Sequence, residues 1–379
     1  MNSYLIVTGD FVRTGGMDMA NFALADHLAA LGHSVQLVTH RADEELSARA
    51  NVSVHQVPKP ANSYLLGGPL LDFKGRARAS AVAAAGGRVV VNGGNCLWGD
   101  VNWVHYVHAA YRPESRGTAL YGYRSRLAHR YALAAERAAL KRARLVLCNS
   151  ERTRLDVVER LGVPESRARV VYYGSDPDRF APVTPEGRRA AKRELGWADG
   201  GPTVAFVGAL SDRRKGFDTL YEAWRELCRG RGWDCDLAVI GRGAELAAWR
   251  RRAQAEGLGG RIRFLGFRRD VPRVLAACDA LAHPARYEAY GLGVRESLCR
   301  GLPALVSASA GVAEHYPATL DCLLLPDAED ARDLAARLRH WRLNMGSIRE
   351  SVSALSEDLR AHTWQRMAEQ IDASVAASD

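Results

Sequence analysis

Two glutamates, Glu288 and Glu296, stand eight positions apart around a glycine-rich stretch that follows an apolar run. Glu296 is expected in the first turn of a helix, where its carboxylate can accept hydrogen bonds from two vicinal hydroxyls. Glu288 is expected on the loop before this helix, where it can bind sugar hydroxyls. A carboxylate that only complements the helix dipole is the alternative for Glu296. Phosphate oxygens can be bound by the backbone amides of the loop, which are those of Ala289, Tyr290, Gly291, Leu292 and Gly293.

A cationic stretch, from Gly208 to Gly216, also lies between a predicted strand and a predicted helix. Its side chains Arg214 and Lys215, beside a helix N-terminus, would suit a diphosphate. A solvated basic turn is the alternative interpretation, because the P-loop pattern GK[ST] is not met here.

Two smaller features lie in the first half of the chain. Gly15 and Gly16 separate the first predicted strand from the first predicted helix, and glycines let a backbone approach an anionic ligand closely. The dinucleotide pattern GxGxxG is not met. His105 and His108 are expected near the carboxyl end of a strand. They are candidates for function, although an isolated histidine is more often a core or surface residue.

Short apolar runs that alternate with longer amphipathic segments must position these residues, and this alternation predicts parallel sheets covered by helices on both faces. In the first half, strands are predicted at 4–8, 34–39, 52–57, 88–92, 103–108, 145–148 and 170–173, and helices at 18–31, 125–143 and 151–161. The second series has strands at 203–207, 236–240, 262–264, 280–283, 304–307 and 322–325, and helices at 217–228, 244–256, 271–277, 293–299, 328–341, 348–360 and 364–373.

The stretch 174–202 between the two series is rich in proline and glycine, and we interpret it as a linker. The chain is therefore predicted to form two doubly wound, Rossmann-like α/β domains. Ligands bind at the carboxyl ends of the strands in such sheets, so two facing domains would put an active site in a central cleft.

Composition narrows the class of protein. The chain has 379 residues, of which 47% are hydrophobic and 25% charged, as in a globular protein of two domains. No apolar run approaches the roughly twenty residues of a membrane span. The N-terminus reads as a core strand and not as a signal peptide, so a cytoplasmic location is expected. The seven cysteines are scattered without a CxxC pair, and no metal site is predicted.

The net charge of +9 is concentrated between Arg112 and Arg144, where eight arginines and one lysine face only two glutamates. Apolar residues recur within this segment at helical spacing, so an amphipathic helix with an arginine-rich solvent face is the simplest interpretation. Docking on an anionic membrane surface is the functional alternative. Nucleic acid is not an expected partner, because no nucleic-acid-binding motif accompanies the charge.

Taken together, the chain resembles the family 4 retaining glycosyltransferases, which have the two-domain GT-B fold. The segment from Glu288 to Glu296, continued by Ser297 to Pro303, is similar to the family's E-x7-E motif with its trailing Gly-x-Pro. The Arg214-Lys215-Gly216 turn, the Gly15-Gly16 loop and the Asn149-Ser150 pair before a helix match as well. The Arg-Lys-Gly turn is similar to that of lipopolysaccharide-core glucosyltransferases. Many family members have Arg where this chain has Ala209, so one diphosphate cation is missing.

The resemblance implies a role for each of these residues. Glu288 would contact the donor sugar and Glu296 the nucleotide ribose, while Lys215 and Arg214 would neutralise the diphosphate. His108 would lie near the transferred sugar, with His105 as the alternate. The remaining assignments are the Gly15-Gly16 loop at the donor phosphates and acceptor, His105 and Asn95 on the acceptor or sugar side, and Glu314 with the amides near Gly311 close to the donor.

The resemblance also implies domains at 1–180 and 181–362, with a C-terminal helix at 363–376 that packs back on the first. It implies a nucleotide-sugar donor, with UDP-glucose favoured and GDP-mannose and UDP-N-acetylglucosamine as the alternatives, and it implies no cofactor and no metal. The acceptor would be a glycan, a glycolipid or a small metabolite, and a peripheral place at the inner membrane face would suit a lipid-linked one. A sugar-nucleotide epimerase, a phosphorylase and a non-catalytic sugar-nucleotide binding protein are the alternatives.

Overall fold

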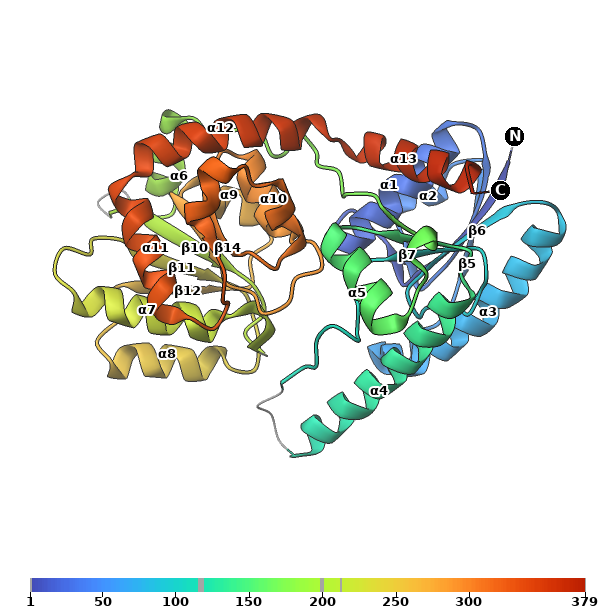
Figure 1. Ribbon diagram of the computed structural model, residues 1–379, viewed down its shortest axis with the longest axis horizontal. Helices are drawn as coiled ribbons and strands as arrows, with labels where there is room; N and C mark the ends of the chain where they lie inside the picture. Colours follow the sequence, from blue (N-terminus) through green and yellow to red (C-terminus); the bar gives the residue numbers. More distant parts are fainter. Residues whose placement is uncertain (1, 115–118, 198–200, 212, 379) are drawn as a thin grey trace. The chain divides into compact units, whose positions relative to one another are not determined.

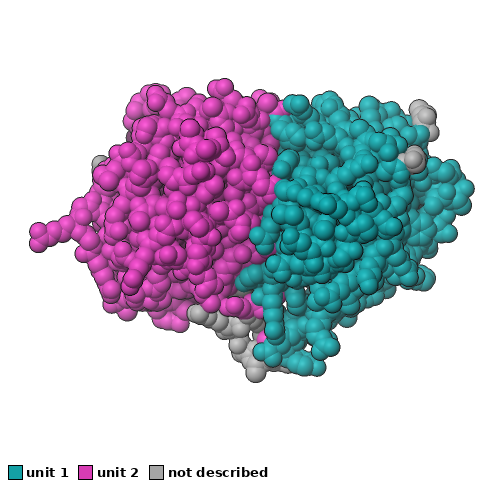
Figure 2. Space-filling model, in the orientation of Figure 1, with its two compact units in different colours: residues 1–112, 123–174, 362–379 teal, residues 113–122, 175–361 magenta. Residues whose placement is uncertain are grey.

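The computed structural model describes residues 2–114, 119–197, 201–211 and 213–378, without the side chains of 119–121. The chain folds into two compact units, which Figure 2 shows in different colours. The first unit comprises residues 1–112, 123–174 and 362–379, and the second comprises 113–122 and 175–361.

The first unit contains a seven-stranded parallel sheet with the strand order β5-β3-β1-β6-β7-β8-β9 (Figure 1). Its strands are β1 (Ser3–Val7), β3 (Ser34–Thr39), β5 (Val52–Gln56), β6 (Arg88–Asn92), β7 (Val101–Val104), β8 (Leu145–Cys148) and β9 (Ala168–Val170). Two short strands, β2 (Asp10–Phe11) and β4 (Arg41–Ala42), form a separate parallel pair. Because the order reverses between β1 and β6, the loops that follow these two strands flank a topological switch point.

Helices cover both faces of this sheet. The chain leaves β1 in one direction through α1 and reaches β6 in the other through α3, so right-handed crossovers put α1 and α3 on opposite faces. The C-terminal helix packs beside α1, and the Tyr4 hydroxyl donates to Asp372 on it. The helices of this unit are α1 (Gly16–Ala30), α2 (Glu44–Ser47), α3 (Tyr64–Ala84), α4 (Ala119–Arg142), α5 (Glu151–Leu161) and α13 (Trp364–Ala376).

The second unit contains a six-stranded parallel sheet with the order β12-β11-β10-β13-β14-β15. Its strands are β10 (Thr203–Val207), β11 (Asp236–Ile240), β12 (Ile262–Gly266), β13 (Ala280–His283), β14 (Ala304–Ser307) and β15 (Leu324–Leu325). Its helices are α6 (Pro185–Glu194), α7 (Phe217–Arg229), α8 (Leu246–Ala255), α9 (Val271–Ala276), α10 (Leu292–Cys299), α11 (Ala331–Leu343) and α12 (Met345–Ala361). The switch point lies between β10 and β13. The prediction of two parallel, Rossmann-like sheets is confirmed.

Several boundaries differ from the predictions. The strand predicted at 103–108 is β7, which ends at Val104 because its partner β8 ends opposite at Cys148. His105 and His108 therefore lie on a loop. The strand predicted at 170–173 is β9 at 168–170. Of the segment 322–325 only Leu324–Leu325 is a strand, because its first two residues end a 3₁₀ turn, Ala318–Leu323.

Three helices, the four-residue α2 and the longer α3 and α6, were missed. The linker prediction for 174–202 is wrong in its middle, where α6 begins with Pro185 after Thr184, whose hydroxyl caps the Gly187 amide at 3.0 Å. Proline at the first position of a helix starts it and does not break it. No element was predicted over α3. Gly75 lies against the sheet, where an added Cβ would be 2.9 Å from Val7.

Candidate functional site

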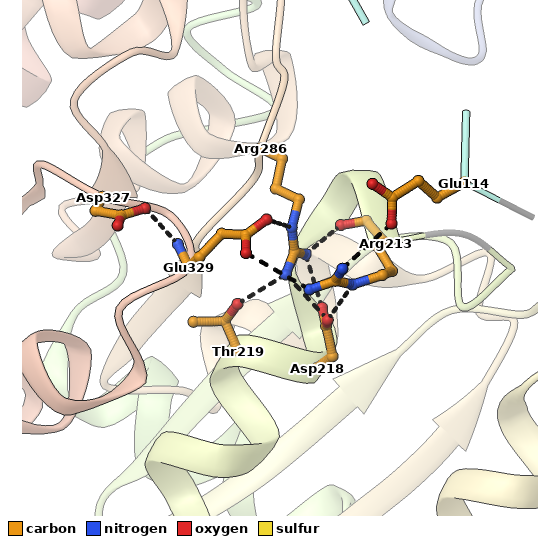
Figure 3. A network of polar contacts seen from close by, with 7 residues as sticks. All are labelled: Glu114, Arg213, Asp218, Thr219, Arg286, Asp327 and Glu329. Atoms are coloured by element: carbon orange, nitrogen blue, oxygen red, sulfur yellow. Dashed lines mark hydrogen bonds and ion pairs between the residues drawn. The ribbon is translucent and has the colours of Figure 1, made fainter. Parts of the chain in front are cut away.

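The cationic turn after β10 is tied to the loop after β13 by a network of ion pairs around Arg286 (Figure 3). The Arg286 guanidinium is 9% exposed and donates to Asp218 at 2.8 Å and to Glu329 at 2.8 Å. Arg213 bonds the same Asp218 at 2.7 Å. Burial works to raise the pKa of Asp218, but the two arginines outweigh it and keep the pKa below its usual range. This network therefore holds the turn Arg213–Lys215 rigidly at the switch point.

Backbone contacts join the same two loops. The Arg286 amide donates to the Arg214 carbonyl at 2.8 Å, and Arg214 donates to the Tyr287 carbonyl at 3.3 Å. Gly216 has a φ of +70°, and a Cβ there would lie 1.7 Å from the Pro284 carbonyl oxygen. Only glycine allows this approach, which sets the position of the residue before it, Lys215.

Lys215, Glu288 and His283 form a polar cluster at the carboxyl ends of β10 and β13, in which His283 is buried and the other two are partly buried. Lys215 Nζ donates to Glu288 Oε2, and His283 Nε2 lies 3.0 Å from the same oxygen. Burial alone would raise the pKa of Glu288, but the Lys215 charge and the His283 hydrogen bond hold it well below its usual range. Burial lowers the pKa of His283, so a neutral His283 donates to an ionised Glu288 at pH 7. The charge of Lys215 therefore lies where a negative ligand group can share it.

The loop from Glu288 to Gly291 is held in place by its neighbour after β14. The Gly311 amide donates to the Glu288 carbonyl at 3.2 Å and the Val312 amide to the Tyr290 carbonyl at 2.7 Å. Gly291 caps α10 with a φ of 107°, so the first-turn amides of α10 begin beside Glu288. The Ala289 and Tyr290 side chains are buried in the core, so the predicted binding of phosphate oxygens falls to their backbone.

Glu296 is the fifth residue of α10, so it lies just beyond the first turn and not within it as predicted. Its side chain is half-buried. Burial raises the pKa of Glu296 to about 7, against the opposing charges of Arg179 and Arg300. A helix-dipole role would need an ionised carboxylate in the first turn, which this position does not provide.

The first unit places its predicted residues at its own switch point. Gly15, with a φ of 87°, caps α1, and Gly16 is the first residue of that helix, directly after the loop that leaves β1. Asn95 lies in the turn after β6, where its amide donates to the Asn92 carbonyl at 2.9 Å. The loops of the two central strands thus bring Gly15, Gly16 and Asn95 to one edge of the sheet.

Both histidines lie on the loop after β7, in different environments. His105 Nδ1 bonds the Tyr173 hydroxyl, its ring is 4.4 Å from that of Trp103, and burial lowers its pKa to about 3. Its carbonyl accepts from Asn149 at 3.2 Å. Burial, with a smaller effect of His129, lowers the pKa of His108 to about 4. Both rings are neutral at pH 7.

Sequence reasoning missed the residue that holds the His108 loop. Glu136, on α4, is buried and accepts from the His108 amide at 2.9 Å and the Ala109 amide at 3.2 Å. Burial raises its pKa to about 7, although these two hydrogen bonds oppose the shift. His283 and Arg286 were also not singled out, although His283 ends a predicted strand and so occupies a typical position for a site residue.

Lys215, Glu288 and Glu296 belong to the second unit, and the glycine pair, Asn95 and the histidines belong to the first. Asp212, part of the predicted cationic stretch, lies outside the described residues, as does 115–118 of the basic segment. Within the described ranges, no group of three or more His, Cys, Asp or Glu side chains could hold a metal ion.

Comparison with protein families gives two matches that together span most of the chain. Residues 14–179 match Glycosyltransferase Family 4, and residues 187–355 match Glycosyl transferases group 1. The chain belongs to the family 4 glycosyltransferases. The resemblance drawn from the E-x7-E segment and the glycine loop is thereby confirmed.

Individual relatives differ in their sequence identity to this chain and in the fraction of each chain that the match covers. The 2-deoxystreptamine N-acetyl-D-glucosaminyltransferase of Streptomyces fradiae is 34% identical over 59% of this chain and 51% of its own, so the chain spans about half the length of this relative. Lipopolysaccharide glucosyltransferase WaaG of Escherichia coli is 27% identical over 81% of this chain and 80% of its own. A crystal structure of WaaG matches 97% of this chain and 99% of its own, with a TM-score of 0.74 and 22% identity. The GT-B fold is therefore confirmed.

Proposed function

We propose that this protein transfers a sugar from a nucleotide-sugar donor to an acceptor hydroxyl, with retention of the anomeric configuration. The Lys215–Glu288–His283 cluster supports this proposal most directly, because it places one cation and one carboxylate that is ionised at pH 7 next to the N-terminus of α10. That combination suits a ligand with a diphosphate at one end and sugar hydroxyls at the other. UDP-glucose is the donor we favour.

In the chemical step, the leaving group is where charge stabilisation is needed most. The bond between the anomeric carbon and the diphosphate oxygen breaks, and its electron pair stays on the diphosphate. Lys215, Arg214 and the first amides of α10 would stabilise this negative charge, a type of contribution worth about 10²–10³ in rate per donor. The acceptor oxygen bonds to the same face of the carbon, and its proton passes to the leaving phosphate. This arrangement needs no metal and no cofactor.

The first unit would bind the acceptor in this scheme. The Gly15–Gly16 loop lets the backbone come close to the donor phosphates and to the acceptor. His108, or His105 as the alternate, would position the transferred sugar through its ring or carbonyl, and Asn95 would contact the sugar side. Because both imidazoles are neutral at pH 7, we assign them hydrogen bonding and not charge stabilisation.

We infer the class of acceptor from the positive charge of the segment between Arg112 and Arg144. Named relatives act on 2-deoxystreptamine, D-inositol 3-phosphate and lipopolysaccharide, which include both small cyclitols and a lipid-linked glycan. The cations from Arg112 to Arg144 favour the lipid-linked type, because they attract an anionic membrane surface. We therefore propose assembly of an envelope glycan or glycolipid at the inner face of a membrane, with a cytoplasmic protein bound peripherally. Among the described residues, no helix is both long and apolar enough to cross a bilayer.

A thermal-shift screen tests the donor assignment. The purified protein is heated with UDP, GDP, ADP, dTDP and their sugar conjugates, with and without EDTA. Saturation at 100 times Kd stabilises the native state by about 2.7 kcal/mol, so the nucleotide that raises Tm identifies the donor base. A shift that EDTA leaves unchanged is expected for UDP. No shift with any nucleotide would contradict the proposal, and release of an epimer without acceptor would favour an epimerase.

The pKa of Glu296 gives a second expected result. Ribose hydroxyls donate to an ionised carboxylate, so donor binding requires Glu296 to lose its proton, and a pKa of about 7 makes this step pH-dependent. UDP-glucose, whose phosphates do not titrate near pH 7, should bind about tenfold more weakly at pH 6 than at pH 8. Isothermal titration measures this, and Glu296→Gln should bind weakly at both pH values. A wild-type affinity that does not change with pH would refute the ribose contact.

A further inference from the structure

Exposed apolar side chains gather on two helices of the first unit. Most of the exposed large hydrophobic side chains in the described part of the chain lie on α3 and α4, with Phe73 at 70% and Tyr123 at 66% exposed. Those on α3 are Tyr64, Leu65, Leu66, Leu70 and Phe73, and those on α4 are Tyr123, Leu127 and Tyr131. A patch of this kind on one face marks an interaction surface.

The inward face of α3 contains several small residues, and its outward face carries large apolar ones. Gly67, Leu71, Gly75, Ala79 and Val82 are buried and follow one stripe of the helix. With glycine in this stripe, the helix backbone can approach the sheet closely, and the opposite stripe points to solvent. Leu66, Leu70 and Phe73 lie at the i, i+4, i+7 positions of that outer stripe.

The two helices lie side by side, as Figure 1 shows. A Cβ on Gly68 would be 3.7 Å from the Tyr131 hydroxyl, which places the N-terminal part of α3 against the middle of α4. Burial, together with the negative charge of Asp72 on α3, raises the pKa of Tyr131. The apolar residues of α3 and α4 therefore form one surface, which we call the α3–α4 face.

Positively charged side chains lie on the same two helices. Lys74, Arg124, Arg126, Arg130 and Arg137 are exposed. Among the residues that the structure describes, none of these five has a carboxylate within ion-pair distance. The acidic residue of α4, Glu136, is buried and turned to the His108 loop. The face thus combines aromatic and leucine side chains with unpaired cations.

We propose that the α3–α4 face inserts into the surface of an anionic lipid bilayer. Leucine and phenylalanine side chains would enter the boundary of the acyl chains, tyrosines would stay at the headgroup level, and the arginines would contact lipid phosphates. This inference extends the membrane part of the proposed function, which rested on the charge of 112–144 alone, and it adds α3 and an apolar contribution. Apolar insertion resists salt, whereas attraction between exposed charges does not.

Vesicle sedimentation tests the inference. The full chain is mixed with vesicles of phosphatidylcholine alone or with 30 mol% phosphatidylglycerol, at about 0.1 and 0.5 M NaCl. The wild type should bind the anionic vesicles and lose less than tenfold in partitioning at the higher salt. Leu66→Ser/Leu70→Ser/Phe73→Ser should bind about 50-fold more weakly at low salt and not detectably at high salt. Removing Arg124, Arg126 and Arg130 should cost about fivefold per charge at low salt.

A matched variant controls for loss of exposed leucines as such. Leu31, Leu155 and Leu343 are exposed on other elements, and the triple Ser variant should bind like the wild type. Binding that salt abolishes and that the α3 variant leaves unchanged would overturn apolar insertion. Binding to no vesicle would overturn membrane docking altogether, and a dimer that the α3 variant dissociates would assign the face to a second copy. Transfer to a soluble acceptor, measured separately, reports on the proposed catalysis whichever result is obtained.

Discussion

Replacing Lys215 with alanine should lower kcat about 10²- to 10³-fold while the protein stays folded. Lys215 pairs with the partly buried Glu288 carboxylate, and in the proposed reaction it stabilises the charge that develops on the leaving diphosphate. The loss should appear in kcat more than in KM, because the leaving group gains most of its charge in the transition state. Steady-state kinetics with UDP-glucose and the acceptor, or hydrolysis of the donor if the acceptor is unknown, measures this effect.

A second lysine in the same unit separates catalysis from stability. Lys192 pairs with the buried Asp279 at 3.1 Å, on α6 and away from the site loops. Lys192→Ala should lower the free energy of unfolding by no more than Lys215→Ala does, because Asp279 keeps Arg188 at 3.5 Å and Arg349 at 3.6 Å. It should leave kcat near the wild-type value. Equal losses of kcat in both variants would show that Lys215 acts only through the fold.

Gly216→Ala should have the largest effect of a single methyl group on this protein. The new Cβ would lie 1.7 Å from the Pro284 carbonyl oxygen, and alanine would also be held at a φ of +70°. The turn and the loop after β13 must separate to relieve this overlap, which moves Lys215 away from Glu288. We expect a loss of about 3 kcal/mol in the free energy of unfolding, measured in urea, and a fall in kcat of at least tenfold.

Gly257→Ala isolates the backbone part of that effect. Gly257 has a φ of +73°, close to that of Gly216, but nothing lies within 4 Å of its added Cβ. Gly257→Ala should lower the free energy of unfolding only by the cost of the left-handed conformation, about 1–2 kcal/mol, and should not change kcat. If Gly216→Ala were no worse than Gly257→Ala in both stability and rate, the close approach of the two loops would not control the site.

Local patterns in the sequence were sufficient to predict most of the strands of the second unit. The strands at 203–207, 236–240, 280–283 and 304–307 were predicted with the bounds that they have, because each is a largely apolar run too short for a helix and bounded mostly by polar residues, glycine or proline. The first unit was harder. Its α3 combines a stripe of small residues with exposed leucines, and this pattern resembles neither an ordinary amphipathic helix nor a buried strand.

By itself, the sequence determined the alternation of strands and helices, hence two parallel sheets, and it determined which loops follow the strands at their carboxyl ends. Those are local properties of hydrophobic period and helix capping. Only the tertiary structure decided which loops meet. Lys215 and Glu288 are 73 residues apart and touch because β10 and β13 are neighbours at a switch point. Strand order depends on crossovers that cover both faces of the sheet, and buried ion pairs such as that of Arg286 form only once this order exists.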